Sequence, residues 1–491
     1  MPEPALLFTT GPALLDRSGG KMKIRDWLKS TLPYLVLAVI LSALFTKKLG
    51  SSGDELWNYN FARNILHGRM PYRDFNMLQT PASAYLSAFF LRLLGEGLLQ
   101  FRFIGLCLGI LCFGMLFVVG KEVVKDALIP FLAAVFSTIV FTIIWEYDYN
   151  HLNLVLILFI MWLEIRHPKR NAIGLLYGLL PIVKQSTGGV LLLLWMGLCI
   201  VDFRRDRDLK VLVKRLGCSC IPGVTFGTVL LCTGSFGSFW DYAIRGVGTF
   251  RHRSTYSAYL FSSPLCFAVG VVPVLATICS LWIIRRNCGR VGRQLHLRLL
   301  LISLAGTVVA YPICDTVHML VADVPFLVCW FCCLKERKFT KRERMICVAV
   351  VMAVTGFLAA DAFRGLDGCK MSGLRHFEGI PVSPDLEQTI EAVDDYILEC
   401  GRNGQRVVIA NEAATLFVIP IDRYNGDFDM LLAGNHGTKS VEELLEDETA
   451  YYLVIRNDTY SLPQAHRELV HYIKENYTKI DEMGNFDVYR K

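Results

Sequence analysis

The sequence predicts an α-helical polytopic membrane protein with about eleven transmembrane helices, additional juxtamembrane helices and a small C-terminal α/β domain. Of its 491 residues, 53% are hydrophobic and only 19% are charged, and the mean hydropathy is +0.40. Long apolar runs recur between residues 31 and 362, and the chain then stays polar from about residue 367. This composition is typical of a membrane protein that carries some water-exposed mass.

The apolar runs define the predicted crossings, because a helix needs about 17–25 mostly apolar residues to span a bilayer. The run at 82–94 is short and contains Arg92, so we interpret it as a juxtamembrane or re-entrant helix. The runs that qualify, some of them only just, are 31–46, 99–119, 127–145, 152–165, 172–184, 187–202, 211–233, 258–284, 297–313, 317–334 and 345–362.

Basic residues in the connections predict the orientation. Lys21, Lys23 and Arg25 precede the first run, which indicates a cytoplasmic N-terminus. If 82–94 does not cross, five basic-rich connections fall on the same cytoplasmic side: 121–125, 166–170, 204–215, 285–298 and 335–344. The net charge of +7 is then a topology signal of a multi-pass plasma (inner) membrane protein, and nucleic acid is not an expected partner.

These observations divide the chain into three parts. Residues 1–30 form a cytoplasmic segment, and residues 31–364 form the transmembrane domain with a first extracytoplasmic loop at 47–98. Residues 365–491 form an extracytoplasmic α/β domain, with a helix predicted after Ser383-Pro384 and buried strands at 406–410, 451–455 and 486–489. Helices are also expected at 440–447 and 463–477. Asp427-Phe428-Asp429 resembles a metal-binding D-x-D, but we interpret it as a chance match in a loop rich in Gly and Asp.

Cysteine usage indicates neither a disulfide framework nor a metal site. Most of the sixteen cysteines lie inside apolar runs, where cysteine behaves as a small hydrophobic residue. Cys218 and Cys220 form a C-x-C, but no histidine or second cysteine pair lies nearby at zinc spacing.

The predicted topology collects the unusual polar motifs on the extracytoplasmic face. The carboxylate pair Asp54-Glu55 lies in the first loop, ahead of several aromatic residues, and Asp148, Lys184-Gln185 and the Asp315-x-x-His318 motif lie in later connections on the same side. Hydrocarbon does not tolerate unpaired charge, so acids and bases this close to a bilayer belong at its surface or in a cavity. Their convergence predicts an active site at the membrane surface.

A family resemblance rests on the first loop. An Asp-Glu pair just after the first span is followed by Trp57, by a G-x-x-PY-x-D element at 68–74 and by Pro81 at the start of the next apolar stretch. This pattern resembles the GT-C glycosyltransferases, and more narrowly the protein-mannosyltransferase/ArnT-like branch that includes RgtA/B/C/D-like proteins. The resemblance implies a GT-C-like transmembrane catalytic domain that transfers a sugar from a polyprenyl-phosphate carrier to an acceptor hydroxyl.

The resemblance also implies roles for individual residues. Asp54 is expected to be the general base, because sugar transfer needs a carboxylate to take the proton of the attacking hydroxyl, and Glu55 is expected to orient a neighbour. Asp148, Tyr72 and Asp74 are expected to hold the acceptor. The donor phosphate is assigned to Lys184, Gln185, Arg73, Asp315 and His318, with Arg251 and Arg253 as further candidates.

Plainer interpretations stay open for the same residues. Asp54 and Glu55 can cap a helix, Lys184 can extend its ammonium to the membrane interface, and Asp315 with His318 can tie two helices together. Related enzymes often have Lys-Pro-Pro where this chain has Gln79-Thr80-Pro81, so a phosphate ligand must come from elsewhere.

We therefore predict a membrane glycosyltransferase with a polyprenyl-phosphate-sugar donor, no cofactor and no divalent metal. Direct displacement by the acceptor would invert the anomeric centre, and the acceptor is left open among a saccharide, a lipid and a protein. The alternative is a non-enzymatic transporter or flippase of a lipid-linked saccharide. The sequence shows no internal repeat of the kind common in transporters, which favours the enzyme.

Overall fold

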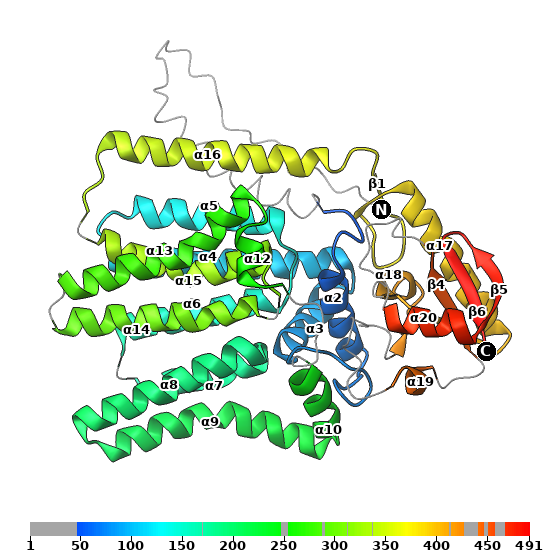
Figure 1. The fold of residues 1–491 in the computed structure, drawn as a ribbon, viewed down its shortest axis with the longest axis horizontal. Coiled ribbons are helices and arrows are strands. Elements are labelled where there is room, and N and C mark those ends of the chain that lie inside the picture. Colours follow the sequence, from blue (N-terminus) through cyan, green and yellow to red (C-terminus); the bar gives the residue numbers. More distant parts are fainter. Residues whose placement is uncertain are drawn as a thin grey trace, which may run out of the picture.

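The computed structural model shows a bundle of long helices with a small sheet-containing region at one end (Figure 1). It describes residues 47–168, 170–246, 254–286, 290–311, 313–335, 337–411, 414–426, 440–445, 450–456 and 467–491. The predictions for residues 1–30, for the run at 31–46, for Arg251 and Arg253 and for residues 427–429 lie outside these ranges.

Helices occupy all ten predicted crossings that fall within the described residues. Seven described helices, counting the segment Gly292–Ala310 as one, are long and apolar enough to cross a membrane, whereas α5 and α7 are shorter. The helices are α4 (Leu98–Val123), α5 (Leu128–Ile144), α6 (Tyr149–Arg166), α7 (Ile173–Val183), α8 (Gln185–Asp206), α9 (Leu209–Cys232), α13 (Pro264–Arg286), α14 (Arg290–Gly306) with the 3₁₀ turn η3 (Thr307–Ala310), α15 (Thr316–Leu334) and α16 (Lys341–Arg364).

Short helices lie at the end of the bundle beside the C-terminal sheet, which we call the domain end (Figure 1). They are α2 (Gly53–Leu66), α3 (Ala82–Leu94), α10 (Phe236–Phe239), the π-helix η2 (Trp240–Arg245) and α12 (Tyr256–Leu260). The thirteen residues of α3 rise only about 20 Å, against roughly 30 Å of bilayer hydrocarbon. This helix is too short to span the hydrocarbon alone, but so is α7 with its eleven residues, so the prediction that α3 does not cross rests on Arg92 and on the charges of the connections.

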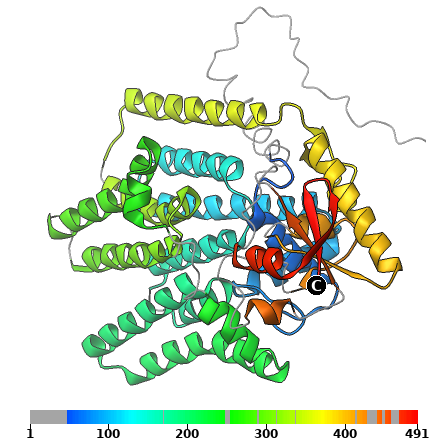
Figure 2. The same ribbon diagram turned by 45° about the vertical axis from the view of Figure 1, so that its right-hand side comes forward.

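The C-terminal region combines a sheet with flanking helices (Figure 2). The four-stranded sheet has the order β3-β4-β6-β5, in which β3 and β4 are parallel and the other pairs antiparallel. Its elements, with the small hairpin that precedes it, are β1 (Lys370–Met371), β2 (Pro381–Val382), α17 (Pro384–Arg402), β3 (Arg406–Ile409), α18 (Ala414–Val418), α19 (Val441–Leu444), β4 (Ala450–Ile455), α20 (Arg467–Asn476), β5 (Thr478–Met483) and β6 (Phe486–Arg490).

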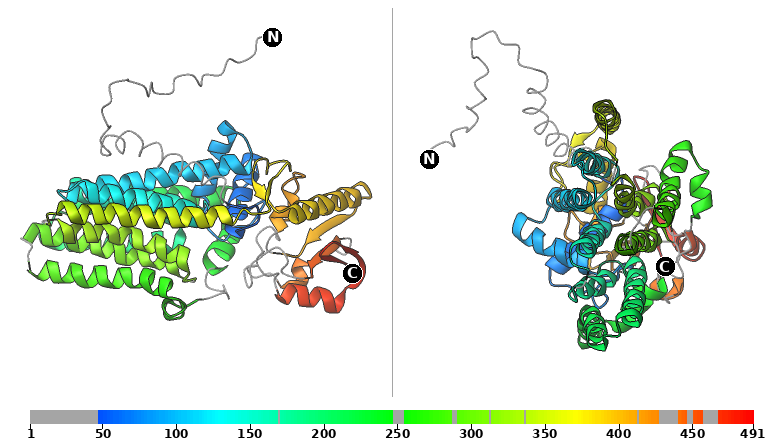
Figure 3. Two further views of the ribbon diagram at one scale, coloured as in Figure 1. Left: turned by 90° about the horizontal axis from the view of Figure 1, so that it is seen from above. Right: turned by 90° about the vertical axis from the view of Figure 1, so that its left-hand side faces the viewer.

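A single apolar core joins this region to the first helices of the bundle. Tyr59 of α2 and Phe101 of α4 belong to the same buried cluster as Phe377, Phe417 and Phe486. The C-terminal region is therefore packed onto α2 and α4 rather than tethered by a linker. The left view of Figure 3 shows this orange and red region at one end of the bundle, next to the blue helices.

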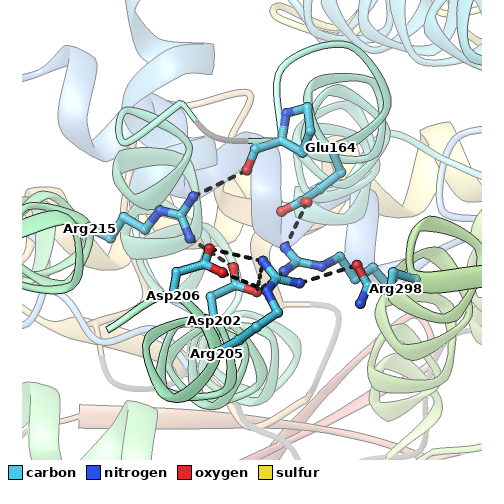
Figure 4. Close-up of polar contacts among 8 residues, drawn as sticks. Glu164, Asp202, Arg205, Asp206, Arg215 and Arg298 are labelled. Carbon is cyan, nitrogen blue, oxygen red and sulfur yellow. Dashed lines mark hydrogen bonds and ion pairs between the residues drawn. The ribbon is translucent and has the colours of Figure 1, made fainter. Parts of the chain in front are cut away.

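The opposite end of the bundle carries the five basic connections, because each of them joins two helices at that end. Ion pairs hold four helices together there (Figure 4). Asp202 of α8 accepts from Arg298 of α14 at 2.5 Å and from Arg215 of α9 at 2.9 Å, and Arg298 also lies 3.4 Å from Glu164 of α6.

Candidate active site

Asp54 lies in the first turn of α2, at the domain end of the bundle. Asp54 is exposed to solvent, yet the protein packed around its carboxyl group raises its pKa to about 6. The negative charge of Asp148 raises that pKa further, and His318 opposes the shift. The raised pKa makes Asp54 a stronger base than an ordinary aspartate.

Asp148 is fixed as the N-cap of α6. Its Oδ1 accepts from the backbone N–H of Asn150 at 2.7 Å, and its Oδ2 accepts from the Asn150 side-chain amide at 2.8 Å. The amide oxygen of Asn150 in turn accepts from Lys184 Nζ at 2.8 Å. Asn150 therefore bridges the acid and the lysine, and all three side chains are buried.

Lys184 is the one residue between α7 and α8, and close backbone packing sets its position. A Cβ at Gly188 would lie 2.2 Å from the carbonyl carbon of Leu180, so only glycine allows the two helices to meet this tightly. The Lys184 ammonium lies 4.9 Å from the centre of the Tyr149 ring. Among the described residues, no ion pair to a carboxylate is present at Lys184. Burial lowers the pKa of its ammonium to about 8, and the negative charges of Asp148, Asp54 and Asp315 oppose this shift from farther away.

Asp315 and His318 form a local pair at the start of α15. Asp315 caps the helix by accepting from the His318 backbone N–H at 2.8 Å, and both of its oxygens lie 2.9 Å from His318 Nδ1. Burial alone would raise the pKa of Asp315, but the hydrogen bonds from His318 outweigh it and lower that pKa. This contact leaves Nε2 as the ring nitrogen that can meet a ligand.

The environment of Glu55 differs from that of its neighbour Asp54, because Glu55 is buried and Asp54 is exposed. Both of its oxygens accept from Arg102 of α4, at 2.8 and 2.7 Å, and both side chains are buried. Arg102 also donates to the backbone carbonyl of Lys47 at 2.9 Å. Glu55 therefore helps to fix the segment that leads into α2 through Arg102.

The residues predicted from the G-x-x-PY-x-D element are not joined to this group. Tyr72 is buried and donates to the carbonyl of Gln79 at 2.5 Å. Arg73 and Asp74 pair with each other at 2.8 Å on the exposed surface, and the hydrogen bond from Arg73 lowers the pKa of Asp74 to about 2. Gln185 donates to the carbonyls of Leu78 and Ala243, at 2.7 and 3.0 Å. These contacts favour structural roles for Tyr72, Arg73 and Asp74 in the first loop and for Gln185 at the start of α8.

Comparison with solved structures identifies the fold. Two crystal structures of ArnT from Cupriavidus metallidurans, one bound to undecaprenyl phosphate and one in the apo state, are similar to this chain. Each has a TM-score of 0.56 at 12% identity and covers 95% of this chain and 98% of ArnT. The chain has the GT-C fold. The resemblance in the first loop is thereby confirmed at the level of this fold.

Other comparisons add little. A cryo-EM structure of the arabinofuranosyltransferase AftD from Mycobacteria has a TM-score of 0.46 at 13% identity. It covers 95% of this chain and 40% of AftD, and this similarity supports no conclusion about the chain. Protein-family models and curated proteins gave no match to the sequence.

Two residues that the GT-C fold brings into this region, Arg102 and Asn150, had no role in the sequence prediction. Arg102 was visible as a charged residue near the start of an apolar run, and ionisable residues in such places mark functional or structural pairs. For Asn150, the only feature of the sequence that indicated a contact with Asp148 was its position two residues later in the chain, and this signal is weak. The bridge depends on Lys184, which is 34 residues away in the chain.

A second polar cluster lies where α2 meets the C-terminal region. One ligand atom each from Glu96, His376 and Asp422 lies within 4.8 Å of the others, which is compatible with a metal ion. However, Arg63 donates to Glu96 at 3.1 Å and to Asp422 at 2.7 Å. The Arg63 guanidinium already donates to both carboxylates and places a positive charge beside them. This donor set is therefore poorly suited to a cation.

Proposed function

We propose that this protein is a membrane glycosyltransferase that transfers a sugar from a polyprenyl-phosphate carrier to an extracytoplasmic acceptor hydroxyl. The GT-C fold supports the class, and the solved ArnT bound to undecaprenyl phosphate supports the carrier. The observation that carries the proposal is that two groups occur in the same site. One is Asp54, an exposed carboxylate with a raised pKa, and the other is Lys184, which forms no ion pair with a carboxylate of the described residues.

Lys184 is proposed to hold the donor phosphate. Removing a lysine from water is costly unless an anion compensates it. Here the groups in contact with the ammonium are a neutral amide and a tyrosine ring, and the carboxylates of Asp148, Asp54 and Asp315 act only from farther away. The N-terminus of α8 begins at the next residue and adds a favourable partial positive charge. As the bond between the sugar and the phosphate breaks, negative charge grows on the leaving oxygen, and Lys184 with His318 would stabilise it.

Asp54 is proposed to be the general base. The acceptor oxygen attacks the anomeric carbon and forms the new glycosidic bond, while the carbon–oxygen bond to the phosphate breaks and the electron pair leaves with the phosphate. The hydroxyl proton passes to the Asp54 carboxylate. A single displacement of this kind inverts the anomeric centre. Asp148, which is held by Asn150, would orient the acceptor opposite Asp54.

The isoprenoid chain has a suitable place beside this group. An apolar groove of about 520 Å³ lies between α3, α7 and α9, and Tyr72, Pro81, Ile182, Phe226 and Leu230 are among its lining residues. Ile182 is two residues from Lys184, so a phosphate at the lysine could lead its carbon chain into this groove. The carrier would enter from the membrane, since the groove is almost wholly apolar.

We also propose that the domain end faces the outside of the plasma (inner) membrane. The support is that the five basic connections gather at the opposite end, where the positive-inside rule expects the cytoplasm. A lipid carrier and an envelope acceptor would then meet on the extracytoplasmic side.

The test is transfer from a panel of undecaprenyl-phosphoryl sugars by the purified protein, combined with mass spectrometry of envelope glycans from a deletion strain. Asp54→Asn should lower kcat by about 10²- to 10⁴-fold, the usual contribution of a general base. Asp367→Asn makes the same change at an exposed residue near the domain end and should retain full activity. If Asp54→Asn transfers sugar normally, the enzymatic proposal fails and the carrier alternative gains.

A further inference from the structure

A broad groove separates the C-terminal region from the segment that leads into α2. One wall is formed by residues 48–51, the second by the first half of α17, and the third by the turn between β5 and β6. The groove encloses about 820 Å³. Figures 1 and 2 show α17 beside the β5–β6 hairpin, close to the start of α2.

Two walls of the groove are joined to each other, and the third is held by the residue that follows β4. The backbone N–H of Leu49 donates to the carbonyl of Pro381 at 2.7 Å, which joins the segment before α2 to the strand before α17. Arg456 donates to the carbonyls of Gly484 and Asn485 in the β5–β6 turn, at 2.6 and 2.8 Å. The groove is therefore formed before any ligand binds, which lowers the entropic cost of binding.

The lining chemistry suits a neutral ligand with many hydroxyl groups. Its polar side chains are mainly hydroxyls and amides, and its single cation, Lys48, is matched by a single carboxylate, Asp385. A polyanion would need more cations, and a divalent ion would need more oxygen ligands with charge. An acyl chain would need an apolar surface, whereas half of these lining residues are polar. Leu49 and Leu386 give an apolar floor for the faces of sugar rings.

One wall of the groove lies close in the chain to the candidate active site. Ser51 lines the groove and is exposed, and Asp54 follows three residues later. A chain segment of three residues spans at most about 10 Å, so a ligand in the groove could present a terminal hydroxyl near the Asp54 carboxylate.

From this arrangement we infer that the groove between residues 48–51, α17 and the β5–β6 turn binds the saccharide portion of the acceptor. The inference rests on the proposed function, and it selects a saccharide among the possible acceptor classes. It also assigns the C-terminal region a role in acceptor recognition, because two of the three walls of the groove belong to it.

The test measures saccharide binding separately from transfer. The probe is the pool of neutral oligosaccharides released by mild acid from the envelope of the source cells, tagged with a fluorophore and titrated against the protein in nanodiscs. Ala392 is exposed on α17 and lines the groove, so Ala392→Trp should fill it and weaken binding by about tenfold or more. Glu399→Trp adds an indole to the same helix at an exposed position outside the groove lining, and its binding should match that of the unmodified protein.

Two further measurements make each outcome decisive. Undecaprenyl phosphate should bind Ala392→Trp normally by native mass spectrometry, which shows that the variant is folded. The inference is overturned if the oligosaccharide pool fails to bind, if Ala392→Trp binds it normally, or if a Ser/Thr-rich peptide displaces it from the groove. Loss of binding in Ala392→Trp supports the groove even if Asp54→Asn still transfers sugar, in which case only the proposed function fails.

Discussion

At the scale of single residues, Asp54 as the proposed general base should make transfer depend on pH. Its pKa is raised to about 6, mainly by burial, and a general base must be ionised to accept a proton. We therefore expect kcat/KM to rise between pH 5 and pH 7 and then level off, with about a tenfold loss for each unit below the inflection. Steady-state kinetics across this range, with donor binding measured in parallel, provide the test. An inflection near the ordinary aspartate value would contradict the assignment.

Asp148 offers an independent check on the same inflection. Its negative charge is the second cause that raises the Asp54 pKa. Asp148→Asn removes this repulsion, so Asp54 should ionise more readily and the inflection of kcat/KM should move to lower pH. A purely structural role for Asp148 would reduce activity without moving the inflection.

The Glu55–Arg102 pair should govern stability more than chemistry. Arg102→Met leaves the buried Glu55 carboxylate without its bidentate partner, which should cost about 3–5 kcal/mol in the free energy of unfolding. The double variant Glu55→Gln, Arg102→Met removes both charges and should recover much of that loss. Thermal unfolding in detergent measures both effects, and equal destabilisation of the single and double variants would refute the role of the buried charge.

At the scale of elements, the sequence was sufficient to predict helices and strands wherever periodicity and composition are strong. Helices lie at all ten of the described apolar runs that were predicted to cross, seven of them long and apolar enough to do so, and β3, β4 and β6 fall on predicted apolar strands. β5 was missed because its six residues (TKIDEM) are mostly polar and exposed, so burial gives no alternating pattern. Its place in the sheet comes from pairing with β6, a tertiary contact that the sequence does not reveal.

The candidate site was predicted less completely, for a similar reason. Topology alone could place Asp54, Asp148, Lys184, Asp315 and His318 at the same end of the bundle, because it depends only on the order of crossings and the loop charges. It could not show that Asn150 joins Asp148 to Lys184, or that Arg73 and Asp74 pair with each other. Motif spacing reports neighbours along the chain, whereas these partners are chosen by packing.

The orientation of the helices gives a prediction of its own. If α3 does not cross, the connection at 337–340 should lie in the cytoplasm, and the C-terminus, which α16 separates from it, should lie outside. An epitope tag inserted between Lys338 and Phe339 should bind antibody only in permeabilised cells, whereas a tag after Lys491 should bind antibody in intact spheroplasts. The reverse pattern would show that residues 82–94 cross the membrane after all.

At the scale of the whole molecule, the interface between α2 and the C-terminal region links the proposed base to the proposed acceptor groove. Arg63 is fully buried in α2, four residues before His67, which also contacts Glu96 at 2.8 Å. Asp422 of the C-terminal region accepts from Arg63 at 2.7 Å and lies 2.8 Å from His376 Nε2. The Arg63 guanidinium therefore joins Glu96, in the loop after α3, to Asp422 of the C-terminal region. We expect this contact to hold the C-terminal region in place on α2.

Replacing Arg63 should loosen that interface. Arg63→Met leaves Glu96 and Asp422 without their shared cation and should destabilise the protein by about 3–5 kcal/mol. Hydrogen–deuterium exchange should rise together in α2 and in residues 414–426, because the two segments lose the same contact. Arg375→Met removes a largely exposed partner of Asp422 and should change stability by less than about 1 kcal/mol, as exposed pairs usually do. Faster exchange confined to residues 414–426 would show that α2 stays ordered without its contact to the C-terminal region. That result would contradict the proposed dependence of the groove on α2.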